Sequence, residues 1–178
     1  MKLLSCVAAV GFVALAATTL HPHAVTRTTL AVPGRANANV SMAVSGSFVA
    51  AVWSASAPAG DTDVFAATSR DGGQTFSAPV RVNSTPGDAR VNGEQPPRLA
   101  LKARAGSVPE VVVVWTTKGS AGTKLLQSTS TDGGRTFAAS TLVPGSDAAG
   151  NRGWEAVAAG PRRTFLQRVA RPTGNCRT

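Results

Sequence analysis

The stretch that decides the fold is SRDGGQTF, residues 69–76, because the chain repeats it as STDGGRTF at residues 130–137. Six of the eight positions are identical, and the two copies lie sixty-one residues apart. A motif that recurs at a fixed interval indicates a repeated structural unit before it indicates a site. The motif is therefore interpreted first as an element of architecture.

The residue types of the motif suit a tight hairpin turn. An aspartate ahead of two glycines can accept hydrogen bonds from backbone N–H groups further round the turn, and glycine tolerates the positive φ angles involved. Hydroxyls beside it satisfy the remaining donors and acceptors, and a phenylalanine buries its ring next to the hairpin. A catalytic loop can be built from such residues too, but the duplication favours structure. The predicted structural residues are Ser69, Asp71, Gly72, Gly73, Thr75 and Phe76 in the first copy and Ser130, Asp132, Gly133, Gly134, Thr136 and Phe137 in the second.

The sequence around the two motifs predicts an all-β fold. Between residues 38 and 143, short β-type runs are broken by Gly, Pro, Ser and Asp, and no amphipathic helix is evident. Two segments can be aligned, and each predicts four strands with the repeated motif between the third and the fourth. The predicted strands are residues 39–44, 47–53, 63–69 and 75–82 in the first segment and 98–103, 110–116, 123–130 and 136–143 in the second.

The second strand of each segment is apolar on successive residues. VAAVW ends at Trp53, and VVVVW ends at Trp115, sixty-two residues later. This pattern is typical of a strand that is covered on both faces, whereas a half-exposed strand alternates. Four-stranded sheets stacked face to face would cover these strands on both sides.

A turn of the form S-x-D-G-G-x-T-F between the third and fourth strands of a repeated unit resembles the Asp-box, or BNR repeat, of the sialidase superfamily of β-propellers. The resemblance covers residues 38–160. It implies a partial β-propeller of the six-bladed sialidase type, with about two four-stranded blades and the start of a third. The implied blades are residues 38–90 and 91–149, and a third begins at residues 150–160.

The resemblance also implies where a ligand would bind. In the family, the boxes lie on the perimeter, and the substrate face is formed by connections that enter first strands and by those between second and third strands. Arginine in such a place can bind the carboxylate of a sialic acid bidentately. The arginines can equally pair with local acids, and Trp154 can pack between blades. The implied glycan-binding residues are Glu94, Arg98, Arg152, Trp154 and Glu155, with Gln95, Asp61, Asp63 and Lys118 on the same connections.

The chain departs from the family in its catalytic residues. Sialidases use a tyrosine nucleophile, and this chain contains no tyrosine. The resemblance therefore implies a glycan-related, exo-alpha-sialidase-like protein that is incomplete and catalytically impaired, so no catalytic residue is assigned. The alternative is a non-catalytic propeller module that binds a glycan or a protein partner. No cofactor and no metal is predicted.

Residues 1–24 have the order of a secretory signal peptide, with Lys2, an apolar run and then a polar region. The apolar run is shorter than the roughly 20 residues of a membrane-spanning helix. The expected location is therefore secreted, periplasmic or at the cell surface, with residues 25–37 as a linker. Cleavage would remove both histidines, which excludes a Ser-His-Asp or Cys-His nucleophile and histidine-bound zinc.

The formal charge of +9 does not indicate a nucleic-acid-binding protein. Five arginines lie in the last eighteen residues, and without them and Lys2 the formal charge is +3. Neither zinc spacing nor an RNA-binding aromatic signature accompanies this charge. Residues 161–178 leave the repeat pattern and are predicted to form an irregular arginine-rich tail. Two or three blades do not close the ring of a β-propeller, and two explanations stay open. The gene is truncated or frame-shifted, or several copies of the chain associate to complete the ring.

Overall fold

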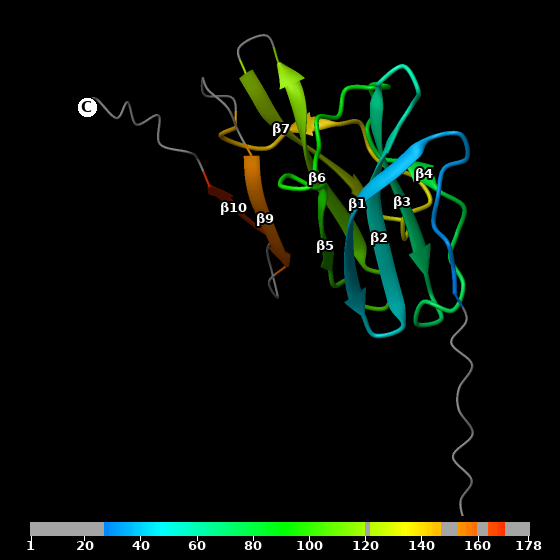
Figure 1. The fold of residues 1–178 in the computed structure, drawn as a ribbon. Helices are drawn as coiled ribbons and strands as arrows, with labels where there is room; N and C mark the ends of the chain where they lie inside the picture. The colour runs from blue at the N-terminus through cyan, green and yellow to red at the C-terminus, as the bar shows by residue number, and fades with distance from the viewer. Residues whose placement is uncertain (1–26, 120–121, 147–152, 160–163, 170–178) are drawn as a thin grey trace, which may run out of the picture.

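The computed structural model describes residues 27–119, 122–146, 153–159 and 164–169, and this part of the chain is all-β, without a helix. It contains two antiparallel four-stranded sheets and a two-stranded hairpin, which lie in that order across the molecule (Figure 1). No helix that could cross a membrane occurs in the described ranges. In chain order the strands are β1 (Ala36–Ser45), β2 (Phe48–Ser56), β3 (Thr62–Ser69), β4 (Val80–Arg81), β5 (Arg98–Lys102), β6 (Glu110–Gly119), β7 (Gly122–Ser130), β8 (Thr141–Leu142), β9 (Gly153–Ala159) and β10 (Thr164–Val169).

Each four-stranded sheet is a simple meander in which every strand pairs with the next. The first sheet has the order β1-β2-β3-β4, and the second has the order β5-β6-β7-β8. Neither sheet closes on itself, so each keeps two edge strands. The prediction of an all-β fold with two four-stranded units is confirmed.

The fourth strand of each sheet is far shorter than the sequence predicts. β4 and β8 have two residues each, at the far ends of the predicted ranges 75–82 and 136–143. Before these strands begin, single backbone bonds, from Ser77 N to Thr68 O and from Ala138 N to Thr129 O, are accompanied by bonds from side-chain hydroxyls. Thr68 N donates to Ser77 Oγ over 3.1 Å in the first sheet, and Ser128 Oγ donates to Ala138 O over 2.6 Å in the second.

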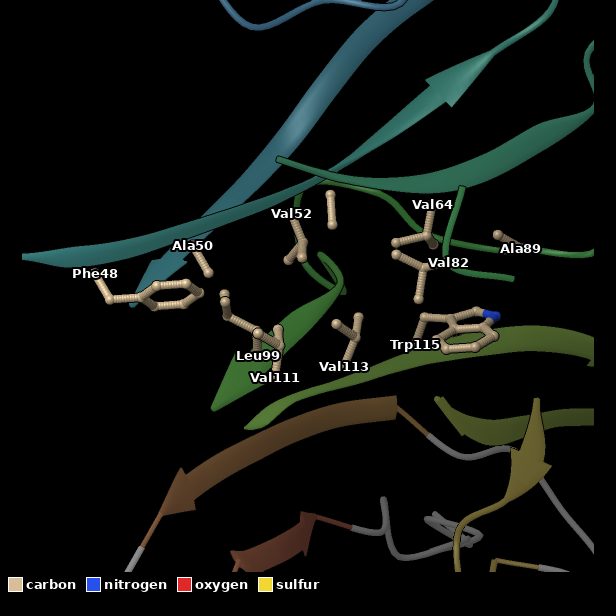
Figure 2. Packing of buried hydrophobic residues seen from close by; sticks show 11 residues of the cluster. Phe48, Ala50, Val52, Val64, Val82, Ala89, Leu99, Val111, Val113 and Trp115 are labelled. Carbon is tan, nitrogen blue, oxygen red and sulfur yellow. The ribbon is translucent and has the colours of Figure 1, made fainter. Parts of the chain in front are cut away.

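The main core lies between the two four-stranded sheets. Side chains of β2 and β3 point at side chains of β5 and β6, as Figure 2 shows, and Trp115 is completely buried among them. Burial of such apolar side chains is worth roughly 1.5–3 kcal/mol each. The core residues are Phe48, Ala50, Val52, Val64, Ala66, Val82, Ala89, Leu99, Val111, Val113 and Trp115.

The second strand of each sheet is buried on both faces, as the unbroken apolar runs predict. Residues 48–55 of β2 and residues 111–117 of β6 are all buried. The far face of the first sheet carries Trp53, which packs with Leu30 and Val32. Residues 27–35, within the predicted linker 25–37, contain no strand, and their side chains Leu30 and Val32 cover this face of the sheet; β1 begins at Ala36, inside the predicted linker.

The predicted irregular tail also contains regular structure. Residues 164–169 form β10, which pairs with β9 in the register Phe165↔Ala158. The prediction of an irregular segment at 161–178 is wrong for these six residues. The sequence TFLQRV is rich in β-branched and aromatic residues, which favour strands, although it lacks the valine and tryptophan pattern of the repeat. The remaining tail residues and the predicted signal peptide, residues 1–24, lie outside the described residues.

Candidate functional site

The first repeated turn uses its aspartate to hold its own backbone. Asp71 accepts a hydrogen bond from Ser69 Oγ over 2.7 Å and bonds from Thr75 N over 2.9 and 3.1 Å. Thr75 Oγ1 donates to the same carboxylate over 2.5 Å. Gly72 and Gly73 have φ angles of 74° and 93°, which an L-residue rarely adopts. The carboxylate of the turn is thus bonded within the turn, while Gly72 N donates to Ser47 O of the preceding hairpin over 2.9 Å.

The second turn repeats this geometry. Asp132 accepts bonds from Ser130 Oγ over 2.7 Å, from Arg135 N over 2.9 Å and from Thr136 Oγ1 over 2.6 Å. Gly134 N donates to Ser130 Oγ over 2.8 Å, as Gly73 N donates to Ser69 Oγ in the first turn. Each turn therefore relies on its serine, its aspartate and its threonine in the same way.

Hydrogen bonding also keeps both aspartates ionised. The hydroxyls of Ser69 and Thr75, followed by the backbone N–H of Thr75, hold the pKa of Asp71 well below its usual range. For Asp132, partial burial acts to raise the pKa, but the bonds from Thr136 and Ser130 outweigh it and lower the pKa. No group of three or more metal-ligating side chains occurs within the described ranges. The geometry of the turns is that of structural clasps.

Asp63, which lies on one of the connections implied to form the substrate face, is buried in a polar network beneath the β3–β5 connection. Arg35 Nη1 donates to its Oδ2 over 2.7 Å, while Asn83 Nδ2 and Gly87 N donate to its Oδ1 over 2.8 and 2.7 Å. Burial alone would raise the pKa of Asp63, but the bonds from Gly87, Asn83 and Arg35 outweigh it and lower the pKa. Its carboxylate is buried and holds the loop after β4 through the bond from Gly87 N.

Arg98 and Glu155, two other implied residues, lie in one groove. Arg98 begins β5 and Glu155 lies on β9, and the groove between these strands and β1 has a volume of about 330 Å³. This volume lies at the lower end of the range of about 300–1,000 Å³ for small-molecule sites. We call it the first-strand groove, and its lining consists of Ser41, Met42, Arg98, Leu99, Glu155, Ala156 and Val157.

Glu155 is the most unusual side chain of the first-strand groove. It is 2% exposed, and neither carboxylate oxygen has a hydrogen-bond partner among the described residues. Burial raises the pKa of Glu155, and the positive charge of Arg98 only partly opposes that shift. A buried polar group without a partner is costly unless a ligand or water completes it. The groove therefore holds, beside a guanidinium, an acid to which no described residue donates a hydrogen bond.

Among the other residues on these connections, Glu94, Gln95 and Asp61 do not line the first-strand groove. Glu94 is exposed on a tight loop before β5, where Asn92 Oδ1 accepts bonds from Glu94 N and Gln95 N over 2.9 Å each. Asp61 is exposed on the β2–β3 loop. The backbones of Lys118 and Trp154 belong to β6 and β9. Arg152 lies outside the described residues.

Two lining residues of the groove come from β1 and were not implied by the sequence. Ser41 pairs with Val52, one residue before Trp53, and Arg98 pairs with Val114, one residue before Trp115. Ser41 and Arg98 therefore occupy equivalent positions of the repeat. Aligning the first strands by their pairing with the tryptophan strands would have found Ser41, and with it the neighbouring Met42.

No family model, curated protein or solved structure matches the chain. The internal repeat is thus the comparison that bears on function, since the positions paired with the two tryptophan strands can be matched between the first and the second sheet.

Proposed function

We propose that the chain is a partial sialidase-type β-propeller whose first-strand groove binds an acidic glycan. The four-stranded sheets would be blades, the repeated turns would be Asp-boxes at their rim, and β9 with β10 would open a third blade. The support for the blades is the order in which the sheets stack, and the support for the ligand is the chemistry of Arg98 and Glu155.

The sheets stack in one repeated sense. We call the side of each sheet that carries Trp53 or Trp115 its tryptophan face. The tryptophan face of the second sheet packs on the opposite face of the first. The opposite face of the second sheet, with Val114 and Leu125, packs against Val157 of β9. Successive units that meet in the same sense are characteristic of stacked repeats, in which each unit gains stability from its neighbours.

Part of the tryptophan face of the first sheet is uncovered. This exposed area also supports the proposal that further sheets stack on the first one. Met42 and Val44 pair with residues two and four positions before Trp53, as Leu99 and Leu101 pair with residues two and four before Trp115. Leu99 and Leu101 pack in the core between the sheets. Their counterparts Met42 and Val44 are 57% and 66% exposed. These positions are suited to contact with a further sheet.

The single observation that carries the ligand proposal is the buried carboxyl of Glu155, which has no hydrogen-bond partner among the described residues and lies beside Arg98 in one groove. A guanidinium can hold a sugar carboxylate in a bidentate pair. Glu155, with its raised pKa, can donate a hydrogen bond from its protonated form to a ligand oxygen. An acidic sugar would supply both a negative charge to pair with the Arg98 guanidinium and a hydrogen-bond acceptor for protonated Glu155. A neutral sugar would supply only the hydrogen-bond acceptor.

Binding without turnover is the form of this function that the residues favour. A retaining sialidase needs a tyrosine nucleophile, and the chain contains no tyrosine. Glu155 alone could serve as a proton donor, but no described side chain of the groove can replace a phenolate. We therefore propose that the chain binds sialosides and does not hydrolyse them efficiently.

The test is calorimetric titration of the full chain with N-acetylneuraminic acid and with its methyl ester, combined with a fluorogenic sialoside assay. We expect the acid to bind, the ester to bind at least about tenfold more weakly because the guanidinium contact is charge-assisted, and turnover to be absent. Arg98→Lys should weaken binding because the planar fork is lost. Arg90→Lys, a change at an exposed arginine outside the groove, is the matched control. Equal binding of acid and ester would overturn the proposal.

A further inference from the structure

Two arginines from different turns line a second groove, at the end of the sheets that carries the repeated motif. Arg70 lies in the first turn and Arg135 in the second. The groove has a volume of about 360 Å³, and its lining also includes hydroxyl groups and an aromatic ring. We call it the arginine groove, and its lining consists of Thr68, Arg70, Asp71, Thr75, Phe76, Ser77, Gly133 and Arg135.

The turn architecture does not require either arginine. The residue that corresponds to Arg70 in the second turn is Thr131, and the residue that corresponds to Arg135 in the first turn is Gln74. Both turns nevertheless form the same hydrogen bonds around their aspartates. The two arginines occupy non-equivalent positions of the repeat and meet only because consecutive turns lie next to each other. Their presence therefore needs an explanation other than the fold of a turn.

Both guanidinium groups are unpaired within the described residues. The ion pairs found there join Arg35 to Asp63 and Lys102 to Glu110. Neither the Arg70 nor the Arg135 side chain forms a hydrogen bond with another described residue. The acid in the groove, Asp71, has both oxygens engaged by Ser69 and Thr75. Two positive charges therefore face one negative charge that is already fully hydrogen-bonded.

The contact between the turns holds Arg70 over the second turn. Thr68 Oγ1 donates to Gly133 O over 2.9 Å, which links the last residues of β3 to the neighbouring turn. Arg70 crosses Gly133 so closely that a Cβ at that glycine would lie 2.7 Å from Arg70 Nη2. The guanidinium of the first turn is thus placed on the side of the groove where the second turn supplies Arg135.

We propose that the arginine groove binds a sulfate or phosphate group, either free or esterified to a saccharide. A tetrahedral oxyanion offers enough oxygens for two guanidiniums approaching from two turns, and each planar fork can bind two of them. The hydroxyl of Ser77 and the ring of Phe76 line the same groove and can contact the remainder of a ligand. This site is separate from the first-strand groove and does not depend on the function proposed for it.

The experiment is calorimetric titration of the full chain at constant ionic strength with inorganic sulfate, inorganic phosphate, 6-O-sulfo-N-acetylglucosamine and N-acetylglucosamine. We expect binding of the sulfated sugar and of at least one inorganic anion, and no binding of the unsulfated sugar. Tighter binding of the sulfated sugar than of sulfate would identify an ester as the ligand. Equal binding would identify the free anion. Absence of binding by all the anionic probes would overturn the proposal.

The variants Arg70→Thr and Arg135→Gln place in each turn the residue that the other turn already has. They should fold normally, which circular dichroism and the urea midpoint would verify. Each should weaken anion binding about tenfold or more, because each removes a charge-assisted contact. Arg90→Gln removes the same charge outside the groove and should leave the affinity unchanged within about twofold, since salt screens distant charges. Equal losses in all three variants, or no loss in the first two, would overturn the proposal.

Discussion

The hydroxyl of Thr68 donates a hydrogen bond to the backbone oxygen of Gly133 over 2.9 Å, and this contact joins the first sheet to the turn of the second. The adjacent Gly134 lies equally close, since a Cβ there would be 2.5 Å from Thr68 Cγ2. The glycines of the second turn therefore serve both the turn itself and the packing of consecutive sheets. Those of the first turn have no such neighbour, because the space around Gly72 is open.

We predict that Gly134→Ala destabilises the protein more than Gly72→Ala. Both glycines have positive φ angles, of 83° and 74°, so each alanine adds about 1–2 kcal/mol of backbone strain. Only Gly134→Ala also forces a clash with Thr68, for a total of about 2–5 kcal/mol. Urea denaturation of both variants would check this. Equal losses would show that the contact between the turns is unimportant for stability.

We predict that Asp71→Asn and Asp132→Asn each lower stability at neutral pH, and that this loss becomes smaller below about pH 4. Both pKa values are lowered in the folded state by the hydroxyl and backbone bonds of the turns. A lowered pKa contributes stability above the unfolded value of 3.8, and that contribution is lost as pH falls through the folded pKa. The difference between wild type and variant should therefore stay constant from about pH 7 to about pH 5 and begin to shrink only below the unfolded value of 3.8, so it should be smaller at about pH 3 than at about pH 7.

The matched control for these aspartates is Asp61→Asn. Asp61 is exposed, and its carboxylate accepts no hydrogen bond from another described residue. We expect this variant to follow the wild-type stability at both pH values. If it lost as much stability as the turn variants, general charge and not the turn geometry would explain the effect.

We predict that Glu155→Gln stabilises the protein increasingly as pH rises. Burial raises the folded pKa of Glu155 above its ordinary value of 4.5, so the folded state resists ionisation that the unfolded chain accepts. The contribution of the neutral Glu155 carboxyl to wild-type stability is therefore lost as pH rises from the unfolded pKa through the folded pKa. Because glutamine cannot ionise, the Glu155→Gln variant does not lose stability in this way. Denaturation at about pH 4 and about pH 7 would reveal the difference, with the exposed Glu94→Gln as control.

We predict that the uncovered tryptophan face of the first sheet mediates self-association. Val40, Met42 and Val44 are all more than half exposed along β1. Exposed apolar stripes of this kind are typical of contact surfaces. Met42→Lys should weaken the association about tenfold or more, because burying one such side chain is worth about 1.5–3 kcal/mol. Sedimentation velocity over a concentration series would measure it.

Leu142→Lys is the control for this surface, since Leu142 is 41% exposed on β8, away from the stripe. It should leave the association constant unchanged. A wild-type protein that stays monomeric at every concentration, or an equal effect of both lysines, would contradict the prediction.

The repeat in the sequence was sufficient to predict the all-β fold, the first three strands of each sheet and the position of the turns. These features are local, because strand periodicity, positive φ at glycine and hydrogen bonds over two to four residues depend on neighbouring residues. The unbroken apolar runs ending at Trp53 and Trp115 were likewise enough to predict strands buried on both faces.

The tertiary structure alone decided which residues meet across the sheets. Arg98 and Glu155 are far apart in sequence, and they share a groove because the first strands β1, β5 and β9 lie side by side (Figure 1). Arg70 and Arg135 meet because consecutive turns are neighbours. Asp63 lies on a connection that the resemblance places at the substrate face, but its carboxylate is a buried anchor of the loop after β4. Such contacts depend on how whole sheets pack, and residue spacing along the chain carries no record of that packing.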